Sequence, residues 1–152
     1  MVDELAALLH GKKTVILGVG NPLQGDDAIG PKLVDVLQGR IDATLINAGQ
    51  VPENYMSAIK AAQPEIVLII VALELGAEPG YIVMLDVDRL RAIENFTCNP
   101  GLAFLAMMIQ DGTDSEVILV GIQPQTTAFA SELSPPVLQS MLNLESLLEN
   151  VY

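Results

Sequence analysis

The sequence predicts a single α/β domain, residues 1–152, in three layers: a mostly parallel, twisted, five-stranded sheet with helices on both faces. Three observations carry this prediction. Short runs of β-branched residues alternate with segments of helical periodicity, which is typical of βαβ units. The most apolar run, IVLIIVAL, shows no period-two alternation, as expected of a central strand covered on both faces. A length of 152 residues with 51% hydrophobic residues suits one domain with a substantial core.

The first half of the chain reads as strands and helices separated by turn-forming residues. Gly11 closes a leading helix that carries leucines on one stripe. Asp26 or Asp27 can cap the start of the second helix, and the apolar pattern of that helix ends at Gly39. Pro64 closes the third helix. The expected elements are a helix at 2–10, strands at 13–19, 43–47 and 65–72, and helices at about 28–38 and 53–62.

The second half continues the alternation. An apolar helix follows the loop FTCNPG, and because it is apolar nearly all round we expect it to be deeply packed. A long irregular segment at 122–136 precedes an amphipathic terminal helix, and loops of this length are often functional. The expected elements are strands at 80–86 and 116–121 and helices at 87–94, 102–110 and 136–151.

Composition excludes several classes of function. The formal net charge is -12, with 19 acidic residues against 7 Lys and Arg, so no basic stripe is available for nucleic acid. A single cysteine, Cys98, rules out an internal disulfide framework. The first residues lack the order of a signal peptide, and the apolar runs are shorter than the roughly 20 residues of a membrane span. We expect a cytoplasmic protein without a membrane or nucleic-acid partner.

Ligands of open α/β sheets bind beyond the carboxyl ends of the strands, which directs attention to the segment GVGNPLQGDDAIGP after the first strand. Its glycines allow close backbone approach, and Asp26 and Asp27 follow at a helix start. Consecutive helical residues point about 100° apart, so one aspartate is expected to cap the helix while the other faces the cleft. A carboxylate facing the cleft can bind a divalent metal, act as a general base, or simply complement the positive helix end.

A dinucleotide fold is the obvious rival, because the first strand ends in glycines. The segment is not G-x-G-x-x-G, since Leu23 stands where the third glycine belongs and Gly25 falls two residues later. The second strand also ends in Asn47-Ala48-Gly49 rather than in an acidic residue. Nucleotide binding is therefore disfavoured.

Four segments, taken together and in order, resemble the hydrogenase maturation proteases. They are VILGVGNPLQGDDAIGPKLV, GQVPEN, ELGAEPG and VGIQP, and the similarity runs over roughly residues 13–125. The last of them is similar to the subgroup that processes hydrogenases of the formate-hydrogenlyase type. The resemblance implies a phosphorylase/hydrolase-like fold and an aspartyl-type endopeptidase that removes the C-terminal peptide of a nickel–iron hydrogenase large-subunit precursor after nickel insertion.

The resemblance also implies three metal-reading residues, of which this chain keeps one. The second acid of the double-acid motif maps onto Asp27. An aspartate expected at the end of the third strand is deleted or replaced, because Val71 is followed directly by Ala72, and the nearest carboxylate is Glu74. The expected pattern Thr-His-Asn reads Thr-Cys-Asn, with Cys98 in place of the histidine.

The candidate metal site is therefore Asp27 with Cys98 and Glu74, and Asp27 is the candidate catalytic residue. The supporting loop residues are Gly20, Asn21, Gly25 and Asp26. Cys98 keeps two interpretations, a thiolate ligand for nickel or a small buried apolar residue. Nickel is expected in the precursor as the recognised metal, and tight metal binding by the isolated protein is not expected.

Two hypotheses for function remain open. The first is a working maturation endopeptidase with an altered metal site, whose partner is the large-subunit precursor. The second is a non-catalytic hydrogenase-assembly or binding protein that keeps the fold and predicts binding without cleavage. No serine or cysteine nucleophile with a neighbouring histidine offers another route, because the sole histidine, His10, lies in the leading helix.

Overall fold

A computed structural model of the chain describes residues 2–94 and 100–152. Its centre is a five-stranded sheet with the strand order β2-β1-β3-β5-β4. The first four strands in that order pair in parallel, and β4 joins β5 antiparallel at one edge. The strands are β1 (Thr14–Val19), β2 (Thr44–Gly49), β3 (Ile66–Ala72), β4 (Ile82–Leu85) and β5 (Glu116–Ile122).

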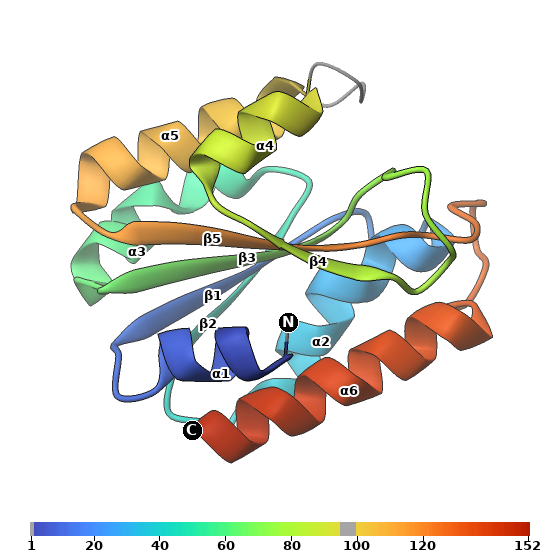
Figure 1. Cartoon of the computed structure of the whole chain (residues 1–152), viewed down its shortest axis with the longest axis horizontal. Helices are drawn as coiled ribbons and strands as arrows, with labels where there is room; N and C mark the ends of the chain where they lie inside the picture. Colours follow the sequence, from blue (N-terminus) through green and yellow to red (C-terminus); the bar gives the residue numbers. More distant parts are fainter. Residues whose placement is uncertain (1, 95–99) are drawn as a thin grey trace.

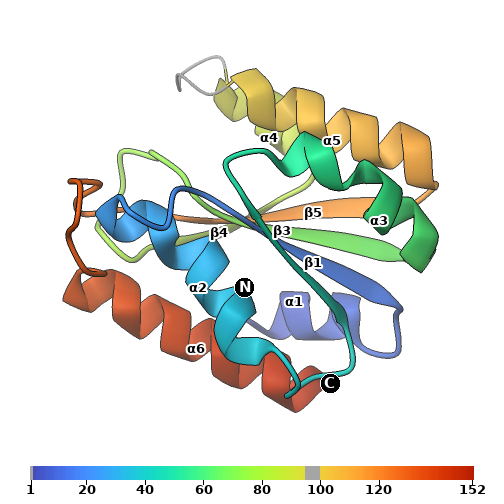
Figure 2. The same cartoon turned by 180° about the vertical axis from the view of Figure 1, so that it is seen from behind.

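Helices cover both faces of this sheet, as Figures 1 and 2 show from opposite sides. Helices α1, α2 and α6 lie on one face, and α3, α4 and α5 lie on the other. Two short 3-10 helices, η1 and η2, precede α2 and α3. Their bounds are α1 (Val2–Leu9), η1 (Gly25–Ala28), α2 (Ile29–Leu37), η2 (Pro52–Tyr55), α3 (Met56–Ala62), α4 (Val87–Glu94), α5 (Pro100–Thr113) and α6 (Pro135–Val151).

The central strand β3 separates two apolar cores. Successive side chains of a strand point to opposite faces, so Val67 and Ile69 enter one core while Leu68 and Ile70 enter the other. All four are fully buried. The continuous apolar run in the sequence is therefore the signature of a strand covered on both sides.

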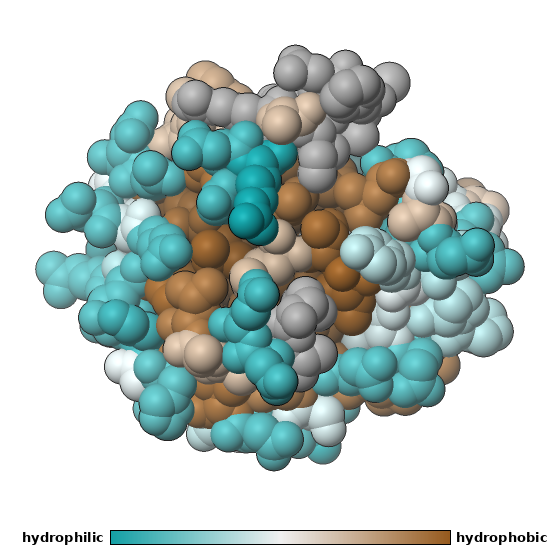
Figure 3. All heavy atoms as spheres, viewed as in Figure 1, coloured by the Kyte–Doolittle hydropathy of each residue, from teal (hydrophilic) through white to brown (hydrophobic). Residues whose placement is uncertain are grey.

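The sheet ends at β4, a strand of four residues whose first three are half-buried. Figure 3, which views the molecule from this side, shows apolar residues in the middle of the face and hydrophilic residues around them. A short edge strand offers few free backbone groups for unwanted pairing with another sheet.

Among the helices of the described residues, none combines the length and apolar character that crossing a membrane requires.

Most elements that the sequence predicts are confirmed, including the alternation of strands and helices. Two expectations are wrong. Neither Asp26 nor Asp27 caps α2, because both lie in η1 and the residue before α2 is Ala28, without a side-chain cap. Helix α5 is packed on one side only, since Phe104 remains 66% exposed.

Gly30 in α2 allows the helix to lie directly on the sheet. A Cβ at this position would stand 2.3 Å from the carbonyl oxygen of Ile70 and 2.8 Å from the backbone of Val19. We expect Gly30→Ala to lower the free energy of unfolding by about 3 kcal/mol, because backbone must shift to admit the methyl group. Urea unfolding followed by circular dichroism measures this loss.

Gly112, near the end of α5, provides the matched control. A Cβ there would meet only the ends of the Lys60 and Met56 side chains, at 3.2 and 3.4 Å. Gly112→Ala should leave stability unchanged or raise it by up to about 1 kcal/mol, as alanine favours helix over glycine. Equal losses in the two variants would contradict the close-packing role of Gly30.

Candidate functional site at the carboxyl edge of the sheet

A cavity of about 300 Å³ lies at the carboxyl ends of β1 and β3. This is the edge at which open α/β sheets place their ligands. Its wall combines the ends of two strands, the 3-10 helices that follow β1 and β2, and the first turns of α5. The lining residues are Val19, Gly20, Asp27, Gln50, Pro52, Glu53, Val71, Ala72, Gly101, Leu102 and Leu105.

Asp27 brings a carboxylate into this cavity from η1. It is half-buried, and its Oδ2 accepts the backbone N–H of Asn21 at 2.8 Å. The Asn21 side chain in turn accepts the N–H of Leu23 at 2.9 Å, the local turn expected of asparagine. Within the described residues, the hydrogen bonds to the Asp27 side chain involve Oδ2, which leaves Oδ1 for a ligand.

Gly20 fixes how closely the strand end and η1 approach each other. Its φ is +147°, and a Cβ there would lie 1.9 Å from the carbonyl oxygen of Asp27. Its N–H donates to the carbonyl of Gly49 at the end of β2, at 2.8 Å. The glycine therefore lets one backbone position join β1, β2 and the segment that carries Asp27.

Asp26 points the other way and is fully buried. Its Oδ2 accepts N–H bonds from Gln125 and Thr126, at 2.8 and 3.1 Å, and the hydroxyl of Ser134 at 2.8 Å. Its Oδ1 accepts the N–H of Ser134 at 2.7 Å. The two neighbouring aspartates thus divide their tasks, Asp27 toward the cavity and Asp26 toward the segment after β5.

These bonds decide the protonation state of Asp26. Burial by itself raises the pKa of the carboxyl, but the hydrogen bonds from Ser134, Thr126 and Gln125 outweigh burial and hold the pKa below the ordinary value of 3.8. Asp26 is therefore an anion at neutral pH. Its charge is stabilised by donors that come from a segment about a hundred residues away in the chain.

The other residues singled out in the sequence take different places. Glu74 is exposed, accepts a bond from Nε2 of Gln123 at 3.0 Å, and is not part of the cavity wall that Asp27 lines. Cys98 lies outside the described residues, although Gly101, a few residues later, lines the cavity. Val71, at the end of β3, contributes an apolar side chain to the same wall.

Glu53 is the carboxylate that our sequence reasoning did not select. It stands in η2 and lines the cavity together with Asp27. The segment GQVPEN contains it, and its place directly after the second strand was the available signal. Across the described residues, 2–94 and 100–152, no group of three His, Cys, Asp or Glu side chains is arranged to hold a metal ion.

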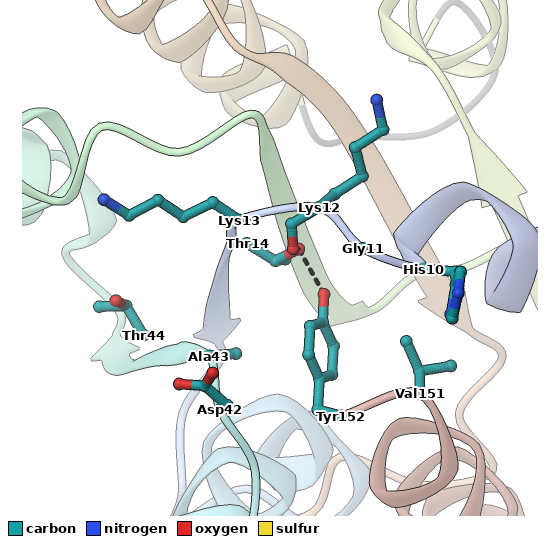
Figure 4. Close-up of a pocket in the computed structure, with 10 residues that line it drawn as sticks. All are labelled: His10, Gly11, Lys12, Lys13, Thr14, Asp42, Ala43, Thr44, Val151 and Tyr152. Carbon is teal, nitrogen blue, oxygen red and sulfur yellow. Dashed lines mark hydrogen bonds between the residues drawn. The ribbon is translucent and has the colours of Figure 1, made fainter.

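A second cavity, of about 650 Å³, opens at the opposite edge of the sheet (Figure 4). The Tyr152 hydroxyl donates to Oγ1 of Thr14 there and ties the end of the chain to β1. His10, Lys12 and Lys13 border this cavity. Lys12 and Lys13 thus lie at the edge of the sheet away from Asp27, beside the acidic Asp42.

The fold and the cavity define an α/β protein with an acidic site at the carboxyl edge of its sheet, and comparison with known proteins identifies the family. The family model described as HycI, hydrogenase maturation protease, matches residues 29–151. The hydrogenase 3 maturation protease of Escherichia coli K12 is 32% identical over 126 residues, covering 81% of this chain and 80% of that protein. A putative hydrogenase maturation protease of Methanocaldococcus jannaschii is 30% identical, with 82% and 80% covered.

Solved structures agree with this result. The crystal structure of the [NiFe] hydrogenase maturation protease HycI from Thermococcus kodakarensis KOD1 superposes with a TM-score of 0.88 at 28% identity, covering 97% of each chain. The structure of a hydrogenase 3 maturation protease gives a TM-score of 0.80 at 31% identity. The chain belongs to the hydrogenase maturation protease family, and the resemblance inferred from its sequence is confirmed.

Proposed function

We propose that this protein is an endopeptidase that removes the C-terminal peptide of a nickel–iron hydrogenase large-subunit precursor in the cytoplasm. The observation that carries the proposal is the Asp27 carboxylate, which the family's double-acid motif brings to a cavity at the carboxyl edge of the sheet. Gly20 and Asn21 hold that carboxylate in a defined orientation. Family membership supplies the substrate class.

Nickel enters this proposal as part of the substrate. Carboxylate oxygen is a suitable ligand for a divalent metal, and Asp27 has Oδ1 free of the bond that Asn21 makes to Oδ2. By contacting the metal in the precursor, Asp27 would position the adjoining peptide bond over the cavity for attack by water. Glu53, in the same wall, adds a second carboxylate that can orient that water or accept its proton.

A specific observation favours the second candidate function, a hydrogenase-assembly protein that binds the precursor without cleaving it. The resemblance implies an aspartate at the end of β3, and there this chain has Val71, which pairs with β1 and β5 in unbroken register. An apolar side chain in the cavity wall removes one metal ligand, and loss of a ligand weakens metal sites severely.

Asp27→Asn separates a role in the reaction from a role in folding. With a nickel-loaded large-subunit precursor, we expect the unaltered chain to cleave slowly and Asp27→Asn to cleave at least about a hundredfold more slowly. Thermal stability should change little, because the amide oxygen can still accept the Asn21 N–H. Gel-shift processing assays over time measure the rate.

Asp3→Asn, at an exposed site in α1, is the control and should process the precursor like the unaltered chain. Cleavage that survives Asp27→Asn undiminished would overturn the site assignment. Stable complex formation without any cleavage by the unaltered chain would favour the assembly function instead.

A further inference from the structure

Two loops, the first of which carries Asp27, are joined into one structural unit. The backbone N–H of Ala130 donates to the carbonyl of Leu23 at 2.8 Å, and the N–H of Asp26 donates to the carbonyl of Thr126 at 2.8 Å. The buried Asp26 carboxylate adds its four bonds to Gln125, Thr126 and Ser134. We call residues 21–27 and 124–134 together the paired-loop platform.

The platform presents two large apolar side chains to solvent. Leu23 is 59% exposed and Phe129 is 74% exposed, one on each loop. Ala130, which follows Phe129, has a φ of +63°, a conformation that costs a non-glycine residue about 1 kcal/mol or more. A hydrogen-bonded loop that holds a phenylalanine exposed beside a strained residue suits a contact site, because an aromatic side chain gains most when a partner covers it.

The loops at the carboxyl edge of the sheet carry charges of one sign. The described loops at the carboxyl edge, residues 20–28, 50–55, 73–81 and 123–134, contain no lysine or arginine. Their acidic residues are Asp26, Asp27, Glu53, Glu74, Glu78 and Glu132. Lys12 and Lys13 border the cavity at the opposite edge. A partner that approaches the platform therefore meets an acidic field around an apolar centre.

We propose that the paired-loop platform is the surface by which this protein docks the folded body of the large-subunit precursor, through a cationic patch that surrounds an apolar recess for Leu23 and Phe129. This inference rests on the proposed function and adds a contact outside the cleavage cavity. The same loop carries Leu23 and Asp27, so docking on the platform places the precursor's C-terminal segment beside the cavity. Apolar contact supplies affinity, and opposite charge supplies steering.

The test measures the Kd between the full-length chain and its nickel-loaded large-subunit precursor by surface plasmon resonance. Leu23→Ser with Phe129→Ser should raise the Kd at least about tenfold, and KM for cleavage should rise in parallel while kcat stays within about twofold. Leu142→Ser is the matched control, since Leu142 is 46% exposed on α6 and outside the platform. Circular dichroism melts verify that each variant is folded.

The salt dependence of precursor binding provides an independent test. Raising sodium chloride from about 0.05 to about 0.5 M should weaken binding of the unaltered chain by about tenfold, because the charges on both partners are exposed. Binding by the double variant that equals that of the unaltered chain, or binding insensitive to salt, would overturn the docking surface while leaving the proposed function intact. An unaltered chain that neither binds nor cleaves the precursor would overturn both.

Discussion

Val71→Asp combined with Cys98→His is expected to raise cleavage of a nickel-loaded large-subunit precursor by at least about a hundredfold. Loss of a residue that only supports a metal ligand commonly costs tenfold to about a hundredfold, and this variant restores two ligands themselves. The side chain at position 71 already forms part of the cavity wall with Asp27, so an aspartate there reaches the same space. Single-turnover processing assays, with precursor in limiting amount, measure the gain.

Val71→Asn with Cys98→His is the matched control. Asparagine has nearly the shape of aspartate but lacks the negative charge that a divalent metal prefers, so this variant should show little of the gain. Val71 is only 4% exposed, so a melt of each variant must accompany the assay. A stably folded Val71→Asp, Cys98→His variant without any gain would mean that the partner surface, and not only the ligand set, differs from that of the active relatives.

The sheet could be predicted from the sequence because its signals are local. The run at β3 is apolar on both faces, and the other three parallel strands, β1, β2 and β5, are each followed by turn residues and a helix with its own apolar stripe. The parallel register then follows from βαβ connections. The antiparallel β4 was harder to predict, since a strand of four residues, the first three of them half-buried, carries a weak pattern.

The role of Asp26 could not be predicted. Sequence reasoning rightly assigned them different directions, but it expected one to cap α2. Three of the four bonds to Asp26 come from backbone N–H groups of the segment after β5, and backbone donors leave no mark in the amino-acid pattern. Glu53 was not predicted for a related reason. An exposed glutamate at a helix start is common, and only the folded chain brings it to the same cavity wall as Asp27.

Asp26→Asn is expected to lower the free energy of unfolding by about 3 kcal/mol at neutral pH. The amide has one oxygen and an NH2 group, so at least one of the buried Ser134 donors loses its acceptor, and a buried donor without an acceptor costs about 1–3 kcal/mol. The lost charge weakens the remaining bonds as well. The midpoint of thermal unfolding should fall by about 10 °C for a chain of this length.

Lowering the pH should narrow the difference in unfolding free energy between the unaltered chain and Asp26→Asn. The pKa of Asp26 in the folded state lies below its unfolded value of 3.8, so its charge contributes stability that is present above that value and is lost as pH falls through the folded pKa. The unaltered chain should therefore lose stability more steeply than Asp26→Asn below about pH 4. Chemical unfolding at intervals between about pH 7 and pH 2.5 gives the change of unfolding free energy with pH for both chains.

Asp27→Asn is the internal control for this experiment, because it changes the neighbouring carboxylate without touching the buried network. Its side chain accepts the Asn21 N–H at a half-buried position, and an amide oxygen can accept the same bond, so its unfolding free energy at neutral pH should stay close to that of the unaltered chain. Parallel pH curves for Asp26→Asn and the unaltered chain would contradict the buried anion. Because the Asp26 bonds also anchor the segment that carries Phe129, the destabilised variant should in addition bind the large-subunit precursor more weakly than Asp27→Asn does.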